Sequence, residues 1–240
     1  SQSQLGLSFV RYYNSSSFAV DKSIGKKWHY SALRTLTEND STRVQVSRGN
    51  GQTFTFNYDS INTVWVGDVD IPDTLVEVID GNSIRTGWVY TDSNDNVESY
   101  NATGQLLSIT NRAGQSQSFV YDLAAIDGGD DNTDTLDKVT GFGGEEMLFS
   151  YDSNNRISTM TDPDGNQYSY NYDAAGNLTS VVYPDNTPLD SLDNPTRTYH
   201  YENVSFPSHL TGLTDETGSR VKWAFDAEGR AISSELDGGI

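Results

Sequence analysis

The sequence reads YDSNNRISTMTDPDGNQYSYNYDAAGNLTSVVY between residues 151 and 183, and this stretch contains one complete copy of a unit that recurs along the chain. A first Tyr-Asp pair begins at Tyr151 and a second begins at Tyr172, 21 residues later. Gly165 lies between them, seven residues before the second pair. Similarity at a fixed period indicates a repeat architecture, in which each copy is one small supersecondary unit.

The same spacing occurs elsewhere in the chain. A step of seven residues from a glycine to an aromatic residue that precedes Asp is found five times. A further step of four residues leads from an aromatic residue to a Gly or Asn where a turn is expected. The repeat positions assigned in this way are Tyr58, Asp59, Gly104, Tyr121, Asp122, Tyr151, Asp152, Gly165, Tyr172, Asp173, Gly176, Phe225, Asp226 and Gly229.

Each aromatic residue ends a segment with the pattern of a β-strand. Tyr168, Tyr170 and Tyr172 occupy alternate positions, and the small polar residues Ser169 and Asn171 lie between them. A period of two places the tyrosines on one face of a strand and the polar residues on the other. The pattern therefore predicts antiparallel strands with one aromatic, core-facing side and one side open to water.

The segments between these strands have the composition of tight turns. Asp162 is followed by Pro163 in the second position and Gly165 in the fourth, as a type I turn prefers. Asp173 and Gly176 repeat the Asp and Gly placement. Each unit of 21 residues is therefore predicted to contain two antiparallel strands and two turns.

The overall charge restricts the classes of partner. The chain of 240 residues has 34 acidic and 15 basic side chains, a net charge of −19. Binding to nucleic acid needs clustered Lys and Arg against phosphate, so a nucleic-acid partner is not expected, and anionic membranes are disfavoured for the same reason. Cysteine is absent from the sequence, which excludes disulfides and thiol chemistry. No apolar run reaches membrane-spanning length, and we expect no membrane insertion.

The domain organisation follows from where the repeat is visible. We predict a single β domain over residues 1–240, with lead-in strands in 1–50 and repeats in 51–236. Two polar stretches, near 123–137 and 184–197, interrupt the repeat and are interpreted as insertion loops. The start of the sequence lacks the basic and apolar layout of a secretory signal, and we expect the chain to be part of a longer polypeptide.

A Tyr-Asp pair followed by a turn Gly or Asn, recurring at about 21 residues, resembles the YD repeat of Rhs proteins. This family includes the shells of insecticidal toxin complexes and the teneurins. The resemblance covers roughly residues 88–236, and the segment His209–Gly218 is similar to a stretch that joins one strand pair to the next. The opening is similar to the lead-in of bacterial members at Phe9, Arg11, Tyr12, Tyr13, Asn14, Ser15, Gly25 and Trp28.

The resemblance implies an all-β fold, an antiparallel YD-repeat β-strip of hairpins that is curved or spiralling as part of a shell. In bacterial members the shell often encloses a toxic C-terminal domain, and it commonly ends in a self-cleaving motif, Asp-Pro-x-Gly-Leu. Here Asp162, Pro163 and Gly165 match that motif, but Asn166 replaces the Leu and the stretch lies inside a repeat. We therefore interpret it as a turn.

The acidic insertion contains the candidate metal ligands of the chain. They are Asp127, Asp130, Asp131, Asn132 and Asp134, and three of them alternate as the first oxygens of an EF-hand do. Thr135 stands where the turn glycine belongs, and Gly141 replaces the bidentate Glu. A solvated loop is the favoured interpretation, a Ca²⁺ site is the alternative, and no other cofactor is expected.

No catalytic residues are assigned. His29, His200 and His209 form no spaced metal motif and no G-x-S-x-G serine accompanies them. A hydrolase that uses Glu145 and Glu146 is disfavoured because both follow a turn at the start of a recurring strand.

Two functions remain. The first is a non-catalytic wall segment of a bacterial Rhs-like protein, secreted or at the cell surface through a larger parent, whose partners are further repeats and a C-terminal cargo domain of the same polypeptide. The second is a surface adhesin or carbohydrate-binding module, with a glycan or protein partner and a Ca²⁺-dependent loop. Binding to a glycan array that a chelator abolishes would favour the second.

Overall fold

The computed structural model describes residues 6–15, 23–121, 135–185 and 194–237. All of the regular elements in these residues are β-strands, which confirms the predicted all-β class. The described parts of the chain contain no helix that could cross a membrane.

The chain divides into two compact units, and each is described by itself. Unit 1 contains residues 1–12, 29–124 and 130–147, and unit 2 contains residues 13–28, 125–129 and 148–240. Strands β1 (Arg11–Tyr13) and β2 (Trp28–Tyr30) form a separate two-stranded pair. The single domain predicted for the whole chain stays a prediction.

Unit 1 is a run of strands in which each one pairs antiparallel with the next along the chain. These strands are β3 (Thr35–Asp40), β4 (Arg43–Ser47), β5 (Thr53–Asp59), β6 (Val64–Gly67), β7 (Thr74–Ile79), β8 (Arg85–Thr91), β9 (Val97–Asn101), β10 (Leu106–Thr110), β11 (Ser116–Tyr121) and β12 (Leu136–Thr140). Paired strands begin at β3, so the predicted lead-in already contains two strands of this sheet. Short turns join most neighbouring strands into hairpins, as the repeat predicts, whereas residues 122–135 lie between β11 and β12.

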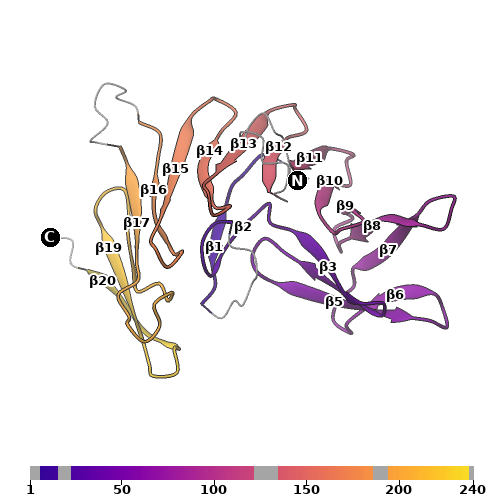
Figure 1. The fold of residues 1–240 in the computed structure, drawn as a ribbon, viewed down its shortest axis with the longest axis horizontal. Helices are drawn as coiled ribbons and strands as arrows, with labels where there is room; N and C mark the ends of the chain where they lie inside the picture. The colour runs from indigo at the N-terminus through magenta and orange to yellow at the C-terminus, as the bar shows by residue number, and fades with distance from the viewer. Residues whose placement is uncertain (1–5, 16–22, 122–134, 186–193, 238–240) are drawn as a thin grey trace. The chain divides into compact units, whose positions relative to one another are not determined.

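Unit 2 has the same construction, and Figure 1 shows its strands following one another as hairpins. Its strands are β13 (Glu146–Tyr151), which begins in unit 1, β14 (Ile157–Thr161), β15 (Gln167–Tyr172), β16 (Leu178–Val182), β17 (Thr196–His200), β18 (Gly212–Thr214), β19 (Arg220–Phe225) and β20 (Ala231–Asp237). Strand β12 begins inside the predicted loop 123–137, and β17 begins inside 184–197, so both loops end earlier than expected.

The aromatic face of the strands is present, but its three positions are buried unequally. On β15, Tyr170 is only 5% exposed, whereas Tyr168 and Tyr172 are half-buried. A β-bulge lies between Asn171 and Tyr172, and bulges occur at the same place before Tyr121, Tyr151 and Phe225. Because a bulge inserts an extra residue and redirects the side chain after it, the aromatic residue before Asp lies at the rim of the core.

Candidate functional site

The five residues Asp173–Asn177 show how a repeat turn is held. The Asp173 backbone N–H donates a hydrogen bond to the Asn177 carbonyl at 3.0 Å. The Asp173 carboxylate then accepts the Asn177 backbone N–H at 2.8 Å and the Asn177 side-chain amide at 2.8 Å. Gly176 adopts a φ of 86°, which glycine reaches without steric cost. The Asp of the Tyr172-Asp173 pair is therefore a turn cap.

The same turn recurs at both ends of the strands. We call the turns that follow the aromatic residue of a repeat the proximal turns: Asn101–Gln105, Asp152–Arg156, Asp173–Asn177 and Asp226–Arg230. We call the turns that precede that strand the distal turns: Asn111–Gln115, Gly141–Glu145, Asp162–Asn166 and Asp215–Ser219. Asp162 caps its turn as Asp173 does, and the interpretation of Asp162-Pro163 as a turn is confirmed.

Hydrogen bonds keep the capping carboxylates ionised. Burial alone would raise the pKa of Asp152, but hydrogen bonds from the side chain and backbone of Arg156 bring that pKa below its ordinary value. The pKa of Asp162 is lowered against the effect of burial in the same way, by Asn166. A carboxylate that is ionised and fully engaged in hydrogen bonds serves as an acceptor rather than as a general acid.

The proximal turns are contact points for other parts of their unit. In unit 1 the Leu36 N–H donates to the Gly104 carbonyl at 2.9 Å. In unit 2 the Lys26 N–H donates to the Gly176 carbonyl at 3.0 Å. A Cβ added at Gly104 would overlap the Leu36 carbonyl oxygen, and one at Gly229 would lie 2.9 Å from the His209 ring.

The distal turns are open. A Cβ added at the positive-φ glycine of any of the four distal turns would meet no described atom within 4 Å; these glycines are Gly114, Gly144, Gly165 and Gly218. In each unit the proximal turns therefore pack against neighbouring segments, whereas the distal turns extend into open space.

In unit 2 the docked segment belongs to the lead-in. Trp28 is 5% exposed, packs edge-on against Tyr199 with ring centroids 4.7 Å apart, and donates from Nε1 to the Tyr201 hydroxyl at 2.8 Å. The Tyr13 hydroxyl accepts the Leu210 N–H at 2.9 Å. Tyr13 and Trp28 are thus built into the repeats that follow more than a hundred residues later.

Unit 1 contains a buried ion cluster that the sequence did not reveal. Glu98 on β9 has no exposed surface, and its carboxylate accepts two bonds from Arg48, at 2.6 and 2.7 Å. Arg34 also donates to this carboxylate, and the Tyr100 hydroxyl donates to it at 2.6 Å. Burial alone would raise the pKa of Glu98, but hydrogen bonds and the charges of Arg48 and Arg34 lower it. Glu98 is therefore held as a carboxylate, and two guanidinium groups face one negative charge.

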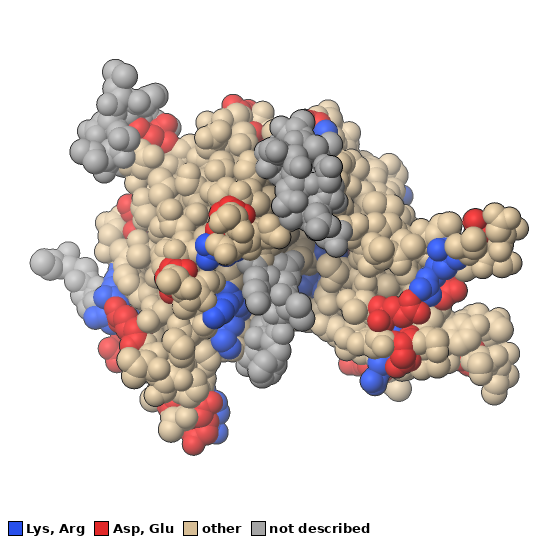
Figure 2. All heavy atoms as spheres, in the orientation of Figure 1, with Lys and Arg blue, Asp and Glu red and all other residues tan. Residues whose placement is uncertain are grey.

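Other basic side chains also lie next to carboxylates. Arg85 binds Glu77 at 3.2 Å and lies over the Trp88 ring, 4.5 Å from its centroid. On the face shown in Figure 2, basic side chains lie beside acidic ones. Paired in this way, the arginines join neighbouring strands through both charge and stacking.

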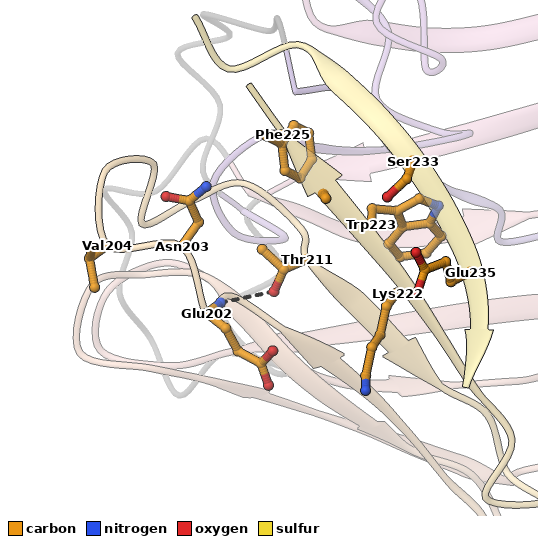
Figure 3. Close-up of a pocket in the computed structure, with 10 residues that line it drawn as sticks. Glu202, Asn203, Val204, Thr211, Lys222, Trp223, Phe225, Ser233 and Glu235 are labelled. Atoms are coloured by element: carbon orange, nitrogen blue, oxygen red, sulfur yellow. Dashed lines mark hydrogen bonds between the residues drawn. The ribbon is translucent and has the colours of Figure 1, made fainter. Parts of the chain in front are cut away.

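A cavity of about 520 Å³ lies in unit 2. Figure 3 shows Trp223 and Lys222 on β19, Ser233 and Glu235 on β20, and Glu202 on a neighbouring segment. Trp223 offers an aromatic surface, whereas the other four side chains offer hydrogen-bonding groups. The cavity suits a ligand with both an apolar face and hydroxyl groups.

The predicted metal ligands Asp127, Asp130, Asp131, Asn132 and Asp134 lie outside the described residues, as does Asp122. Within the described ranges, no group of three or more His, Asp or Glu side chains could hold a metal ion. The Ca²⁺ site therefore stays a prediction.

The remaining candidates make separate local contacts. The His200 ring bonds the Thr214 hydroxyl at 2.8 Å, the His209 ring stacks on Phe206 at 4.8 Å, and His29 is buried. Burial lowers the pKa of both His200 and His209. Glu146 binds Lys138 at 2.8 Å.

The fold and its sites define an all-β repeat protein built from antiparallel hairpins with capped turns. The family model described as RHS Repeat matches residues 151–188, so this stretch is an RHS repeat, and the resemblance seen in the Tyr-Asp spacing is confirmed. A second family model, described as Domain of unknown function (DUF6531), matches residues 2–56. A search of the curated proteins found no match.

Several solved structures are similar at low identity. A chain of the Photorhabdus luminescens Tc holotoxin pore is 14% identical over 81% of this chain and 11% of that chain, with a TM-score of 0.42. TcdB2-TccC3 without its hypervariable C-terminal region is 15% identical over 88% and 13%, with a TM-score of 0.42. The N-terminal domain of effector protein SpvB from Salmonella typhimurium is 11% identical over 98% and 94%, with a TM-score of 0.37.

The chain therefore spans 11% and 13% of the length of the two toxin chains that it resembles. Because all three TM-scores lie below 0.5, the assignment of the fold rests on the strand pairing and on the RHS Repeat match.

Proposed function

We propose that this chain is a non-catalytic wall segment of a bacterial Rhs/YD-repeat protein, secreted or displayed at the cell surface, whose parent polypeptide encloses or presents a C-terminal toxin domain. The observation that carries the proposal is the RHS repeat at residues 151–188, in which capped turns join β13 to β14, β14 to β15 and β15 to β16. The partners are further repeats and the cargo of the same polypeptide.

The use of equivalent residues in successive copies supports a structural role. The Asp or Asn that starts a turn accepts hydrogen bonds in each of the described proximal turns. The middle residue of the aromatic face is buried in successive hairpins, as Phe119, Phe149 and Tyr170 show. A scaffold requires the same task in each copy, whereas a single binding or catalytic site does not.

The state of the carboxylates supports a non-catalytic segment. A general acid needs a raised pKa and a general base needs a free lone pair near its substrate. The capping carboxylates of Asp152 and Asp162 instead have lowered pKa values and engaged oxygens.

The mass of the native parent protein tests this function. We expect a chain far longer than 240 residues that is cut near its C-terminus, with the small fragment retained in native conditions and released by denaturant. A parent scarcely longer than this chain, with no retained fragment, would contradict the enclosure of a cargo.

The cavity beside Trp223 favours one alternative, a carbohydrate-binding module at the cell surface. Aromatic rings with neighbouring polar groups suit sugars, which have apolar faces and hydroxyl edges. A glycan array would show selective binding that Trp223→Ala abolishes and that Trp65→Ala, a substitution in unit 1, leaves intact. Loss of that binding on addition of a chelator would link it to the acidic insertion, and binding to no glycan would remove this alternative.

A further inference from the structure

A turn of unit 1 that is neither one of the four proximal turns nor one of the four distal turns departs from the capping rule. The turn Arg48–Gln52 has the usual backbone bonds, since the Arg48 N–H donates to the Gln52 carbonyl at 2.8 Å and the Gly51 N–H donates to the Arg48 carbonyl at 2.8 Å. Its first residue is an arginine, however, where most of the turns have Asp or Asn. The Asn50 side chain takes over the cap and accepts the Gln52 N–H at 3.0 Å.

This exchange directs a guanidinium group inward. Arg48 reaches Glu98 and lies over the Tyr90 ring, 4.8 Å from its centroid, and its side chain is only 13% exposed. Positions where a local rule is broken in an otherwise regular protein are expected at functional or strained sites. The Arg48 turn is therefore a place to look for a site that the other repeats do not have.

A cavity of about 250 Å³ opens beside this turn. Its polar lining includes Ser31, Arg34, Arg48, Asn50 and Gln52, and the exposed ring of Tyr12 also contributes to the wall. None of the described residues that line it is a carboxylate. The volume is below that of typical drug-sized pockets and suits a group the size of one sugar or one amino acid.

The charge of the cavity is positive within an acidic chain. Arg34 and Arg48 share the carboxylate of Glu98, so the ion pairs of this cluster join two guanidinium groups to one buried carboxylate, and the charge of Arg48 also acts to lower the pKa of Asp92. Glu98 has no exposed surface, so it stays behind the arginines and does not reach the cavity. The Arg34 Nε is buried and has no hydrogen-bond partner among the described residues. The net charge of the whole chain is −19, so this local excess sets the cavity apart from its surroundings.

We propose that the cavity formed by Arg34, Arg48, Ser31, Asn50 and Gln52 binds the carboxylate group of a small ligand, in addition to the structural role of the repeats. Guanidinium groups match the planar, two-oxygen geometry of a carboxylate, and the side-chain amides of Asn50 and Gln52 supply further donors. Two sources share this chemistry, a sugar acid and a peptide C-terminus. The Tyr12 ring at the rim offers either of them an apolar contact.

The test is a titration of the chain with four probes at constant ionic strength, followed by calorimetry or by backbone amide shifts. Sodium glucuronate represents the sugar acid, N-acetylglycine the peptide C-terminus, inorganic phosphate another oxyanion, and glucose the neutral control. We expect saturable binding of glucuronate, of N-acetylglycine or of both, and the stronger of the two identifies the source. Binding of neither, or tighter binding of phosphate or glucose, would overturn the proposal.

A pair of matched variants separates the site from the fold. Gln52→Glu places a negative charge at the cavity, and Gln115→Glu makes the same change at the same position of the distal turn Asn111–Gln115. In both turns an Asn side-chain amide donates to the Gln side-chain oxygen at 2.8 Å, an interaction that Glu preserves. We expect Gln52→Glu to weaken carboxylate binding at least about tenfold and Gln115→Glu to leave it unchanged. Equal affinities of the two variants would overturn the proposal.

Discussion

Two turns of unit 1 have nearly the same sequence and backbone but very different surroundings. Asn101–Gln105 reads NATGQ and Asn111–Gln115 reads NRAGQ, and their glycines have φ values of 88° and 78°. The first, a proximal turn, receives the Leu36 N–H and lies against the Leu36 carbonyl, whereas the second, a distal turn, is open. The local sequence thus determines the conformation of the turn. The segment that docks on the turn determines how much the stability of the fold depends on that turn.

The largest expected difference comes from the two glycines. Gly104→Ala is predicted to destabilise unit 1 by about 5 kcal/mol or more, because a positive φ costs a non-glycine residue about 1–3 kcal/mol and the new Cβ also overlaps a backbone carbonyl. Gly114→Ala incurs only the conformational cost, about 1–3 kcal/mol. Denaturant midpoints with unchanged m-values measure both. Equal losses in the two variants would show that Leu36 is not packed on the proximal turn.

Two tryptophans in unit 2 allow a similar comparison, between the docked lead-in and a strand of the repeats. Trp28 is 5% exposed and contacts Tyr199, whereas Trp223 is half-buried on β19. Trp28→Ala is therefore expected to cost about 3–5 kcal/mol, the range for a buried aromatic residue. Trp223→Ala should cost less than half as much, since less of its surface leaves water on folding. A Trp28→Ala variant with the same denaturant midpoint as the wild type would show that the lead-in is not part of the core.

Removing a capping carboxylate is expected to lower the stability less than the glycine and tryptophan substitutions do. Asp152→Ala, in a proximal turn, removes acceptors for the backbone and side chain of Arg156 and is expected to cost about 1 kcal/mol. Asp162→Ala, in a distal turn, should cost less because its partners are exposed and water replaces the lost bonds. Thermal unfolding of the two variants beside the wild type measures this difference. A larger loss for the distal variant would reverse the ranking.

The caps also make stability depend on pH. The pKa values of Asp152 and Asp162 lie below the ordinary value of 3.8 in the folded chain, so unfolding is accompanied by proton uptake in acid. Their contribution is complete above about pH 5 and is lost as the pH falls from there through the folded pKa values. The denaturant midpoint of the wild type should thus decrease as the pH is lowered from 6 to 3. Asp162→Asn, which keeps an oxygen acceptor but carries no charge, should make that decrease smaller. A flat pH profile would contradict the role of ionised caps.

Much of the fold could be predicted because its determinants are local. The alternation of Tyr168, Tyr170 and Tyr172 indicates a strand, and the placement of Asp173 and Gly176 indicates the turn that follows. The unequal burial of these tyrosines could not be predicted, since it depends on a bulge that pattern alone does not show.

Contacts between distant segments were missed for a different reason. Arg34, Arg48 and Glu98 come from segments separated by up to 64 residues, and nothing in the sequence near Glu98 distinguishes it from an exposed strand residue. The one usable signal was Arg48 itself, an arginine where related turns begin with Asp or Asn. The docking of Trp28 on Tyr199 likewise depends on tertiary structure and has no local signature.

Hydrogen exchange at two backbone amides tests the central claim, that one row of turns is packed into the fold and the other is free. The Gly104 N–H donates to the Asn101 carbonyl at 3.1 Å, and the Gly114 N–H donates to the Asn111 carbonyl at 2.9 Å, so the two bonds are equivalent in geometry. If docking stabilises the proximal turn, Gly104 should exchange at least about 100-fold more slowly than Gly114, because Gly114 can open locally. Equal exchange rates after correction for intrinsic chemistry would contradict the account.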